Sequence, residues 1–434
     1  MNLIFFAIVL IAFLMTAWRQ VVWTPGSADE AAPMDALGRA MIDAAAGSVT
    51  LAIGLVGVMA LFLGLMKVAE AGGLLQIIAR TLRPVMVRLF PDVPADHPAM
   101  GAMILNMSAN ALGLGNAATP FGIRAMQELD RLNPCKGTAT NAMALFLAIN
   151  TSSVTLLPTG VIALRAAAGS TDPAGILPTT LFATICSTTA AIVATKLYQR
   201  YSAFPPHDYA PGEDGDEAPE PEAATEEALP DDASAAYPGW VSALVIGSIV
   251  ALIPLAILYG KSIAPWIIPS LMVGLLGFGA ARRVRVYESF VEGAKDGFQV
   301  ALRIIPYLVA ILVAVAMFRA SGAMEAVIGP LGAVTGLFGL PAEALPMALL
   351  RPLSGSGAYG ILASLINDPA IGPDSYVGYL VSTFQGSTET TFYVIAVYFG
   401  AVQVRRLRHA LAAALTADLA GIAGAVFIVW FLYG

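Results

Sequence analysis

Apolar runs of about 20 residues recur along this chain, and a run of that length is what an α-helix needs to cross a bilayer. Nine clear candidates occupy 2–18, 46–66, 139–164, 176–198, 240–259, 263–281, 297–318, 376–402 and 409–432. The composition agrees, because 57% of the residues are hydrophobic and only 12% are charged. We therefore expect an all-α, multi-pass membrane protein.

Two further apolar runs, 98–123 and 343–366, are interrupted by Gly, Ser, Asn and Pro. Irregular backbone at membrane depth has to be buried in protein or to line an aqueous cavity. The topology also requires each run to return to the side from which it entered. We therefore predict two re-entrant helical hairpins, with the tips NMSANALGLGN (106–116) and RPLSGSG (351–357) near the middle of the bilayer.

Lys and Arg near the helix ends predict the orientation, because cytoplasmic loops are enriched in them. The strongest clusters are ARRVR at 281–285 and RRLR at 405–408. Placing both in the cytoplasm of a bacterial inner membrane puts the N-terminus and segment 201–239 there too, and the C-terminus in the periplasm. This segment carries eleven acids and no Lys or Arg, so we expect a disordered linker between halves 1–200 and 240–434.

The two halves resemble each other. Residues 44–75 align on 293–325, pairing Gly47 with Gly297 and Gly72 with Gly322. Each half then has a broken apolar run and a polar cluster, NTSSVTLLPTG (150–160) and QGSTETTFYVI (385–395). Because the charges orient the equivalent segments oppositely, we predict two repeats of inverted topology with a site at their interface.

The candidate binding residues share a place on the hairpin tips or in the two polar clusters. They are Asn106, Asn110, Asn116, Asn150, Ser152, Arg351, Ser354, Ser356, Gln385, Ser387, Glu389 and Thr390. Arg303 and Asp418 lie inside apolar helices and are candidates for coupling or for a buried ion pair.

Each candidate has a structural alternative. The serines could cap short helices, and the asparagines could join helices by hydrogen bonds. Arg351 with Glu389, and Arg303 with Asp418, could be structural ion pairs. The sequence leaves both interpretations open.

No enzyme, cofactor or metal is predicted. Cys135 and Cys186 have no CxxC spacing, and the three histidines, His97, His207 and His409, are scattered, with His409 expected at the membrane interface. The glycine-rich strings lack a Walker lysine. Ser354 and Ser356 have no evident base for nucleophilic catalysis.

Long strings resemble known families. SANALGLGNAATPFGIRAMQELDRLNP (108–134) resembles the signature stretch of spore maturation protein A. LPMALLRPLSGSGAYG (345–360) and STFQGSTETTFYVIAVYFGAV (382–402) resemble that of spore maturation protein B. Both are similar to the Gate, or nucleoside-recognition, domain found also in concentrative nucleoside transporters and the ferrous iron transporter B. The resemblance implies a fusion of two Gate-type halves with inverted repeats and re-entrant hairpins.

Two functions follow as expectations. The first is a secondary transporter of a small polar or anionic solute, with a central site between the hairpins. The alternative is a non-transporting scaffold or regulator of envelope or spore maturation processes. The expected partners are the bilayer and an unidentified solute, with no nucleic acid, and the small-residue helices would suit a homo-oligomer.

Overall fold

The computed structural model describes residues 2–24, 31–113, 115–152, 155–202 and 237–434, and in these ranges the chain is helical, without a named β-strand. The first-half helices are α1 (Asn2–Val21), α2 (Pro33–Ala71), α3 (Leu74–Leu89), α4 (Pro98–Ala111), α5 (Gly115–Arg131), α6 (Asn141–Ser152), α7 (Thr159–Ala167) and α8 (Leu177–Tyr198). The second-half helices are α9 (Gly239–Ala281), α10 (Val286–Ala320), α11 (Ala323–Thr335), α12 (Leu345–Leu350), α13 (Gly355–Ile366), α14 (Tyr376–Ser387), α15 (Thr391–Gly400) and α16 (Ala410–Tyr433). Most of the predicted acidic linker lies outside the described residues.

The same order of elements occurs in both halves. In the first half, α3 is followed by a helical hairpin (α4–α5), a broken helix (α6–α7) and a long helix (α8). In the second half, α11 is followed by the same three parts: the hairpin α12–α13, the broken helix α14–α15 and the long helix α16. The alignment predicted from sequence is wrong by one residue. Gly73 and Gly322 open α3 and α11 with φ of 83° and 77°, a left-handed conformation that glycine adopts without a Cβ clash. Gly73, and not Gly72, is therefore the counterpart of Gly322.

Both predicted hairpins are confirmed. α4 and α5 pack against each other and turn after Ala111, although the pair extends to Arg131, beyond the predicted end at 123. The second turn falls on Arg351–Ser354, between α12 and α13. It forms there because Pro352 cannot continue a helix and Ser354 caps the next one by accepting a hydrogen bond from Gly357 N.

Several predicted crossing helices are shorter than expected. Segments 139–164 and 376–402 are each broken in the middle, into α6–α7 and α14–α15. Among the described residues, α2, α8 and α16 are long and apolar enough to cross a membrane unaided. A fourth crossing would combine Ile328–Phe338 with Ala342–Leu350, which meet at 110°. Polar breaks therefore account for two of the nine candidates, 139–164 and 376–402.

Segments 240–259 and 263–281 both fall within one helical range, α9. This helix cannot be straight. Tyr237 N donates to Arg80 O (3.3 Å), while Phe278 lies against Gly72. A straight helix would separate residues 237 and 278 by about 60 Å, yet Gly72 and Arg80 can lie at most about 30 Å apart. α9 is therefore sharply bent.

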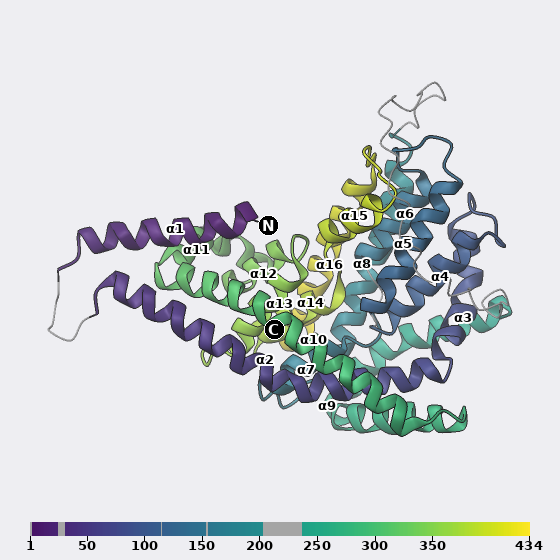
Figure 1. Ribbon diagram of the computed structural model, residues 1–434, viewed down its shortest axis with the longest axis horizontal. Helices are drawn as coiled ribbons and strands as arrows, with labels where there is room; N and C mark the ends of the chain where they lie inside the picture. The colour runs from purple at the N-terminus through teal and green to yellow at the C-terminus, as the bar shows by residue number, and fades with distance from the viewer. Residues whose placement is uncertain (1, 25–30, 114, 153–154, 203–236) are drawn as a thin grey trace.

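Equivalent helices of the two halves run antiparallel. α2 and α10 lie side by side, with Gly297 against Ala60 and Phe290 against Gly64 (Figure 1). α8 and α16 are paired in the same sense, because residues near the end of α8 contact the beginning of α16. Antiparallel pairs are what an inverted repeat requires, but the side of the membrane on which each helix ends stays a prediction.

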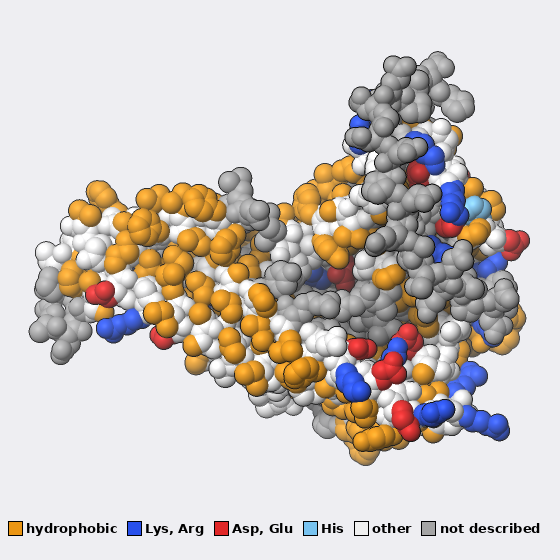
Figure 2. All heavy atoms as spheres, viewed as in Figure 1, with side chains coloured by type: hydrophobic (Ala, Val, Ile, Leu, Met, Phe, Trp, Pro, Cys, Tyr) orange, Lys and Arg blue, Asp and Glu red, His pale blue; other side chains and the backbone are white. Residues whose placement is uncertain are grey.

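An arm of α1, α11 and the first part of α2 projects from a larger lobe that contains α3–α6, α8, α15 and α16 (Figure 1). Figure 2 shows hydrophobic side chains over much of the arm, and Phe6, Phe13 and Trp18 of α1 are 59%, 49% and 71% exposed. Such a surface suits contact with lipid.

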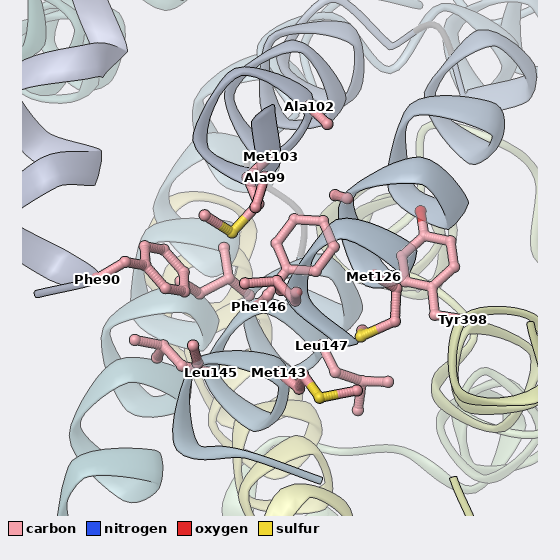
Figure 3. Close-up of a cluster of buried hydrophobic side chains, with 14 of the residues drawn as sticks. Phe90, Ala99, Ala102, Met103, Met126, Met143, Leu145, Phe146, Leu147 and Tyr398 are labelled. Atoms are coloured by element: carbon pink, nitrogen blue, oxygen red, sulfur yellow. The ribbon is translucent and has the colours of Figure 1, made fainter. Parts of the chain in front are cut away.

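Inside the lobe, the largest buried cluster packs α4 and α6 around Phe146, with Phe90, Met103 and Met126 beside it (Figure 3). Tyr398 of α15 completes it and stacks on Phe146, with ring centroids 6.0 Å apart. The core therefore fixes α6 and α15, whose broken ends form the site described below.

Candidate functional site

The two broken helices meet at their breaks. Glu389 N donates to Thr151 O (2.8 Å), which joins the break of the second half to the end of α6 in the first. Each break is also closed by the hairpin of its own half: Leu156 N donates to Ala111 O (2.9 Å), and Phe392 N donates to Pro352 O (3.0 Å). Backbone groups freed by the breaks are thus paired inside the protein, as irregular chain at membrane depth requires.

The first-half asparagines form a network with Tyr398. The Asn106 side chain donates to Ala118 O (2.8 Å) and to the Tyr398 hydroxyl (3.1 Å). Asn110 donates to the Asn150 side-chain oxygen (3.0 Å). The sequence analysis missed Tyr398, whose contact with Gly122 on α5 leaves no room for a side chain there.

Arg351 anchors the second break. Its guanidinium group donates to Thr390 Oγ1 (3.0 Å), Gln385 O (3.2 Å) and Thr388 O, and the residue is only 4% exposed. The carbonyls belong to the C-terminal end of α14, where a helix dipole favours a positive charge. Both terminal nitrogens are therefore engaged by the protein itself.

Glu389 faces outward. Its carboxylate lies 3.9 Å from Arg351 Nη2, and its side chain is 44% exposed. The contact predicted from the sequence is present, but at the distance limit of an ion pair. Figure 2 shows basic and acidic side chains in the notch between the arm and the lobe.

Asp418 of α16 lines a small cavity together with Arg351. Its Oδ2 accepts a hydrogen bond from Thr391 Oγ1 (2.7 Å), and the residue is 4% exposed. A cavity of about 10 Å³ is lined by Arg351, Pro352, Phe384, Ser387, Thr388, Asp418 and Ile422. This volume corresponds to about one water molecule. The Arg303 side chain, which the sequence analysis paired with Asp418, lies outside the described residues.

The remaining candidate binding residues differ in burial and in their contacts. Ser354 caps α13, as its structural alternative predicted, and Ser356 is exposed on the first turn of that helix. Ser152 is buried and hydrogen-bonded to Thr188 (3.1 Å). Ser387 is buried and lines the small cavity. The Asn116 side chain is not among the described ones.

Two arginine contacts join the halves at opposite ends of the broken helices. Arg165 of α7, which is fully buried, donates to Pro373 O (2.6 Å) and pairs with Asp374 (3.1 Å). Partial burial favours the neutral Asp374 carboxyl group, but hydrogen bonds from Ser170 and Thr171 and the charge of Arg165 hold its pKa below the usual value.

At the other end, Arg408 donates to Ala139 O (2.9 Å) and to the Asn141 side chain (3.1 Å). The neighbouring His409 is 5% exposed and is packed at the start of α16, and its place at the membrane interface stays a prediction. Burial, with the nearby charge of Arg408, lowers the pKa of His409 to about 4.

A larger cavity of about 820 Å³ lies away from the breaks. Small residues of α2 and α10 line it, together with Ala363, Ser364 and Asn367 near the end of α13. In the described part of the chain, no cluster of three or more His, Cys, Asp or Glu side chains could hold a metal ion.

These features define a class: an all-α, multi-pass membrane protein of two repeats, each with a short-helix hairpin closing a broken helix. A family model described as nucleoside recognition, Gate, matches residues 52–168 and 301–405, about half of the chain. The protein belongs to the Gate family.

Two relatives from Bacillus subtilis (strain 168) match separately. Spore maturation protein B is 47% identical over 167 residues, which cover 38% of this chain and 93% of that protein. Spore maturation protein A is 46% identical over 159 residues, covering 37% of this chain and 81% of that protein. The two matches agree with a fusion of two such halves.

Among solved structures, the YdaH transporter of Alcanivorax borkumensis is 18% identical, with a TM-score of 0.37 over 98% of this chain and 97% of that one. The similarity is too distant to bear on function.

Proposed function

We propose that this protein is a secondary transporter of a small polar solute, with its site where the two hairpins meet the two broken helices. The observation that carries the proposal is the junction of the breaks through Glu389 and Thr151. Discontinuous helices at a repeat interface are the usual setting of solute and ion sites in secondary transporters. The family description, nucleoside recognition, is compatible with a small solute.

The charges at the junction favour a solute that donates hydrogen bonds. Arg351 uses both terminal nitrogens for protein acceptors, so it has little left for an anion. Glu389 is the half-exposed charged group and can accept hydrogen bonds from a hydroxyl or amino group. This argument favours the polar solute over the anionic one.

The junction is closed in this conformation. The cavity beside Arg351 has a volume of about 10 Å³, whereas small-molecule sites usually measure about 300–1,000 Å³. Binding would require the second hairpin to move away from the break. The same closed junction also supports the second candidate, a scaffold without transport, in which these polar groups only stabilise the fold.

Solute uptake by proteoliposomes distinguishes a transporter from a scaffold without transport. Tritiated uridine is the first probe, followed by small amines and amino acids, each with and without a proton or sodium gradient. We expect saturable uptake of at least one probe, lost in Glu389→Gln. The matched control is Glu288→Gln, which makes the same change at an exposed position near the start of α10. Equal uptake by wild-type protein and empty vesicles for every probe would favour the scaffold.

A further inference from the structure

Two buried polar atoms face the small cavity between the second hairpin and α16 without a hydrogen-bond partner among the described residues: Arg351 Nε and Asp418 Oδ1. Buried donors and acceptors rarely stay unpaired, because desolvation without a partner is costly. The cavity can hold about one water molecule. A water in this cavity has both functions that these atoms lack, since it can accept from Arg351 Nε and donate to Asp418 Oδ1.

The charges around this cavity do not balance. Arg351 supplies one positive charge, while Asp418 and Glu389 supply two negative charges when ionised. Glu389 is 44% exposed by its side chain and can be solvated, whereas Asp418 is 4% exposed. An uncompensated charge in a low-dielectric interior is costly, so the buried cluster favours uptake of one proton.

We propose that Asp418 is a reversible proton-binding site, reached through the water beside Arg351, and that its protonation controls how firmly the second hairpin is held against the break. The inference rests on the proposed transport function for its biological meaning. A proton from water forms the O–H bond of the Asp418 carboxyl group on binding and returns to water on release.

The surroundings leave Asp418 as the group that titrates in this cavity. Arg351 faces it from the hairpin turn, and Glu389 lies beyond Arg351 at the break. From α8, Cys186 packs near Gly424, and Tyr198 bonds Thr416. α6, which also packs on α16, contains no ionisable side chain. From α14, Tyr379 stacks on Tyr433 at the C-terminal end of α16, and from α15, Tyr398 is hydrogen-bonded to Asn106.

The hairpin responds because Arg351 belongs to its turn. With Asp418 ionised, Arg351 is attracted by Asp418 as well as by the α14 carbonyls and Glu389. Protonation removes the Asp418 attraction while the carbonyl bonds remain. The turn is therefore held less firmly in the protonated state, which links proton binding to opening of the junction.

Infrared difference spectroscopy on the purified full-length protein tests proton binding without any solute. The part of the carboxylic acid C=O band that Asp418→Asn removes should appear in a single step as pH falls, and it should persist in Glu389→Gln; the other Asp and Glu residues contribute equally to all three spectra near pH 4. Retention in Asp418→Asn with loss in Glu389→Gln would assign the proton to Glu389 and overturn the inference. So would the absence of a titrating band between pH 4 and 9.

A second variant covers the case in which Asp418→Asn does not fold. Thr391→Val removes the hydrogen bond to Asp418 Oδ2, which favours the charged carboxylate. The midpoint of the band should therefore move to higher pH, and an unchanged midpoint would contradict the assignment.

Maleimide labelling of Ala358→Cys, which is 0% exposed in α13, with Cys135 and Cys186 replaced by alanine, reports on opening of the hairpin. At one fixed pH above the wild-type midpoint, Asp418→Asn should label about fivefold faster or more, the lower end of couplings between sites. Fixing the pH removes the thiol's own titration. Equal rates would refute control of the hairpin. A titrating band without uptake of any probe would support the proton site and contradict transport. Uptake without a titrating band would support transport and contradict the proton site.

Discussion

Replacing Arg351 by alanine should destabilise the protein by about 3–5 kcal/mol, the cost of removing one member of a buried charged arrangement. The guanidinium group donates to Thr390, Gln385 and Thr388, and each hydrogen bond to a charged group is worth about 1.5–3 kcal/mol. The loss stays below the sum of three such bonds because water can enter the vacated space and solvate the carbonyls.

The structure predicts a strong asymmetry between Arg351 and Glu389. Glu389→Ala should cost less than about 1 kcal/mol, because a half-exposed carboxylate at 3.9 Å resembles a surface ion pair. The double variant should then match Arg351→Ala to within about 0.5 kcal/mol. Arg351→Lys keeps the charge but loses the planar fork, so it should fall between wild type and Arg351→Ala.

Equilibrium unfolding in detergent micelles, followed by circular dichroism, gives the four free energies. Two results together would refute the reasoning: a loss in Glu389→Ala as large as that in Arg351→Ala, and recovery of most of it in the double variant. They would show that Arg351 and Glu389 form a structural ion pair, and that the carbonyl contacts at the end of α14 contribute little.

Three further predictions concern other parts of the chain. Gly122→Ala should cost about 1–3 kcal/mol because its Cβ would collide with Tyr398, whereas Gly54→Ala, which meets open space, should be neutral or slightly stabilising in the same unfolding assay. Stability should be insensitive to His409 above its unfolded pKa of about 6.5 and fall towards pH 4 by up to about 1.4 kcal/mol per unit, since the unfolded chain takes up a proton that the folded one refuses; His409→Gln should remove this slope. A membrane-impermeant maleimide should label Ala370→Cys from the periplasm in intact cells, and labelling only after lysis would reverse the predicted orientation.

Local signals in the sequence were sufficient for the hairpins. Arg351, Pro352 and the following serines and glycines interrupt an apolar run so strongly that the turn between α12 and α13 could be placed to within a few residues. The asparagines and the break at Glu389 could be selected for a similar reason, because polar residues are conspicuous in an apolar segment.

The partners of these residues could not be predicted. Tyr398 and Thr391 look like ordinary members of α15, and only long-range packing brings them to Asn106 and Asp418. The Arg351 contacts to backbone carbonyls have no sequence signature at all, so the sequence suggested Glu389 as its main partner. The sequence analysis divides 240–281 into two apolar runs at 260–262, and the helical backbone that continues across this link could not be predicted from it.

Dividing the chain within the linker, into halves 1–200 and 240–434, tests how far each half depends on the other. The break at Glu389 is joined to Thr151, Arg165 is paired with Asp374, and α8 packs along α16. A half on its own would leave these groups unpaired at membrane depth, where each unpaired polar group is costly. We therefore expect the two halves to co-purify as a folded complex when produced together, and each to be degraded or aggregated when produced alone. The matched control is Arg165→Ala in the first half, which should weaken co-purification because Asp374 and the Pro373 carbonyl lose their shared donor. If either half alone gave the same thermal transition and protease resistance as the full chain, the inter-half contacts would be accessory, and the junction of the breaks could not be essential to the fold.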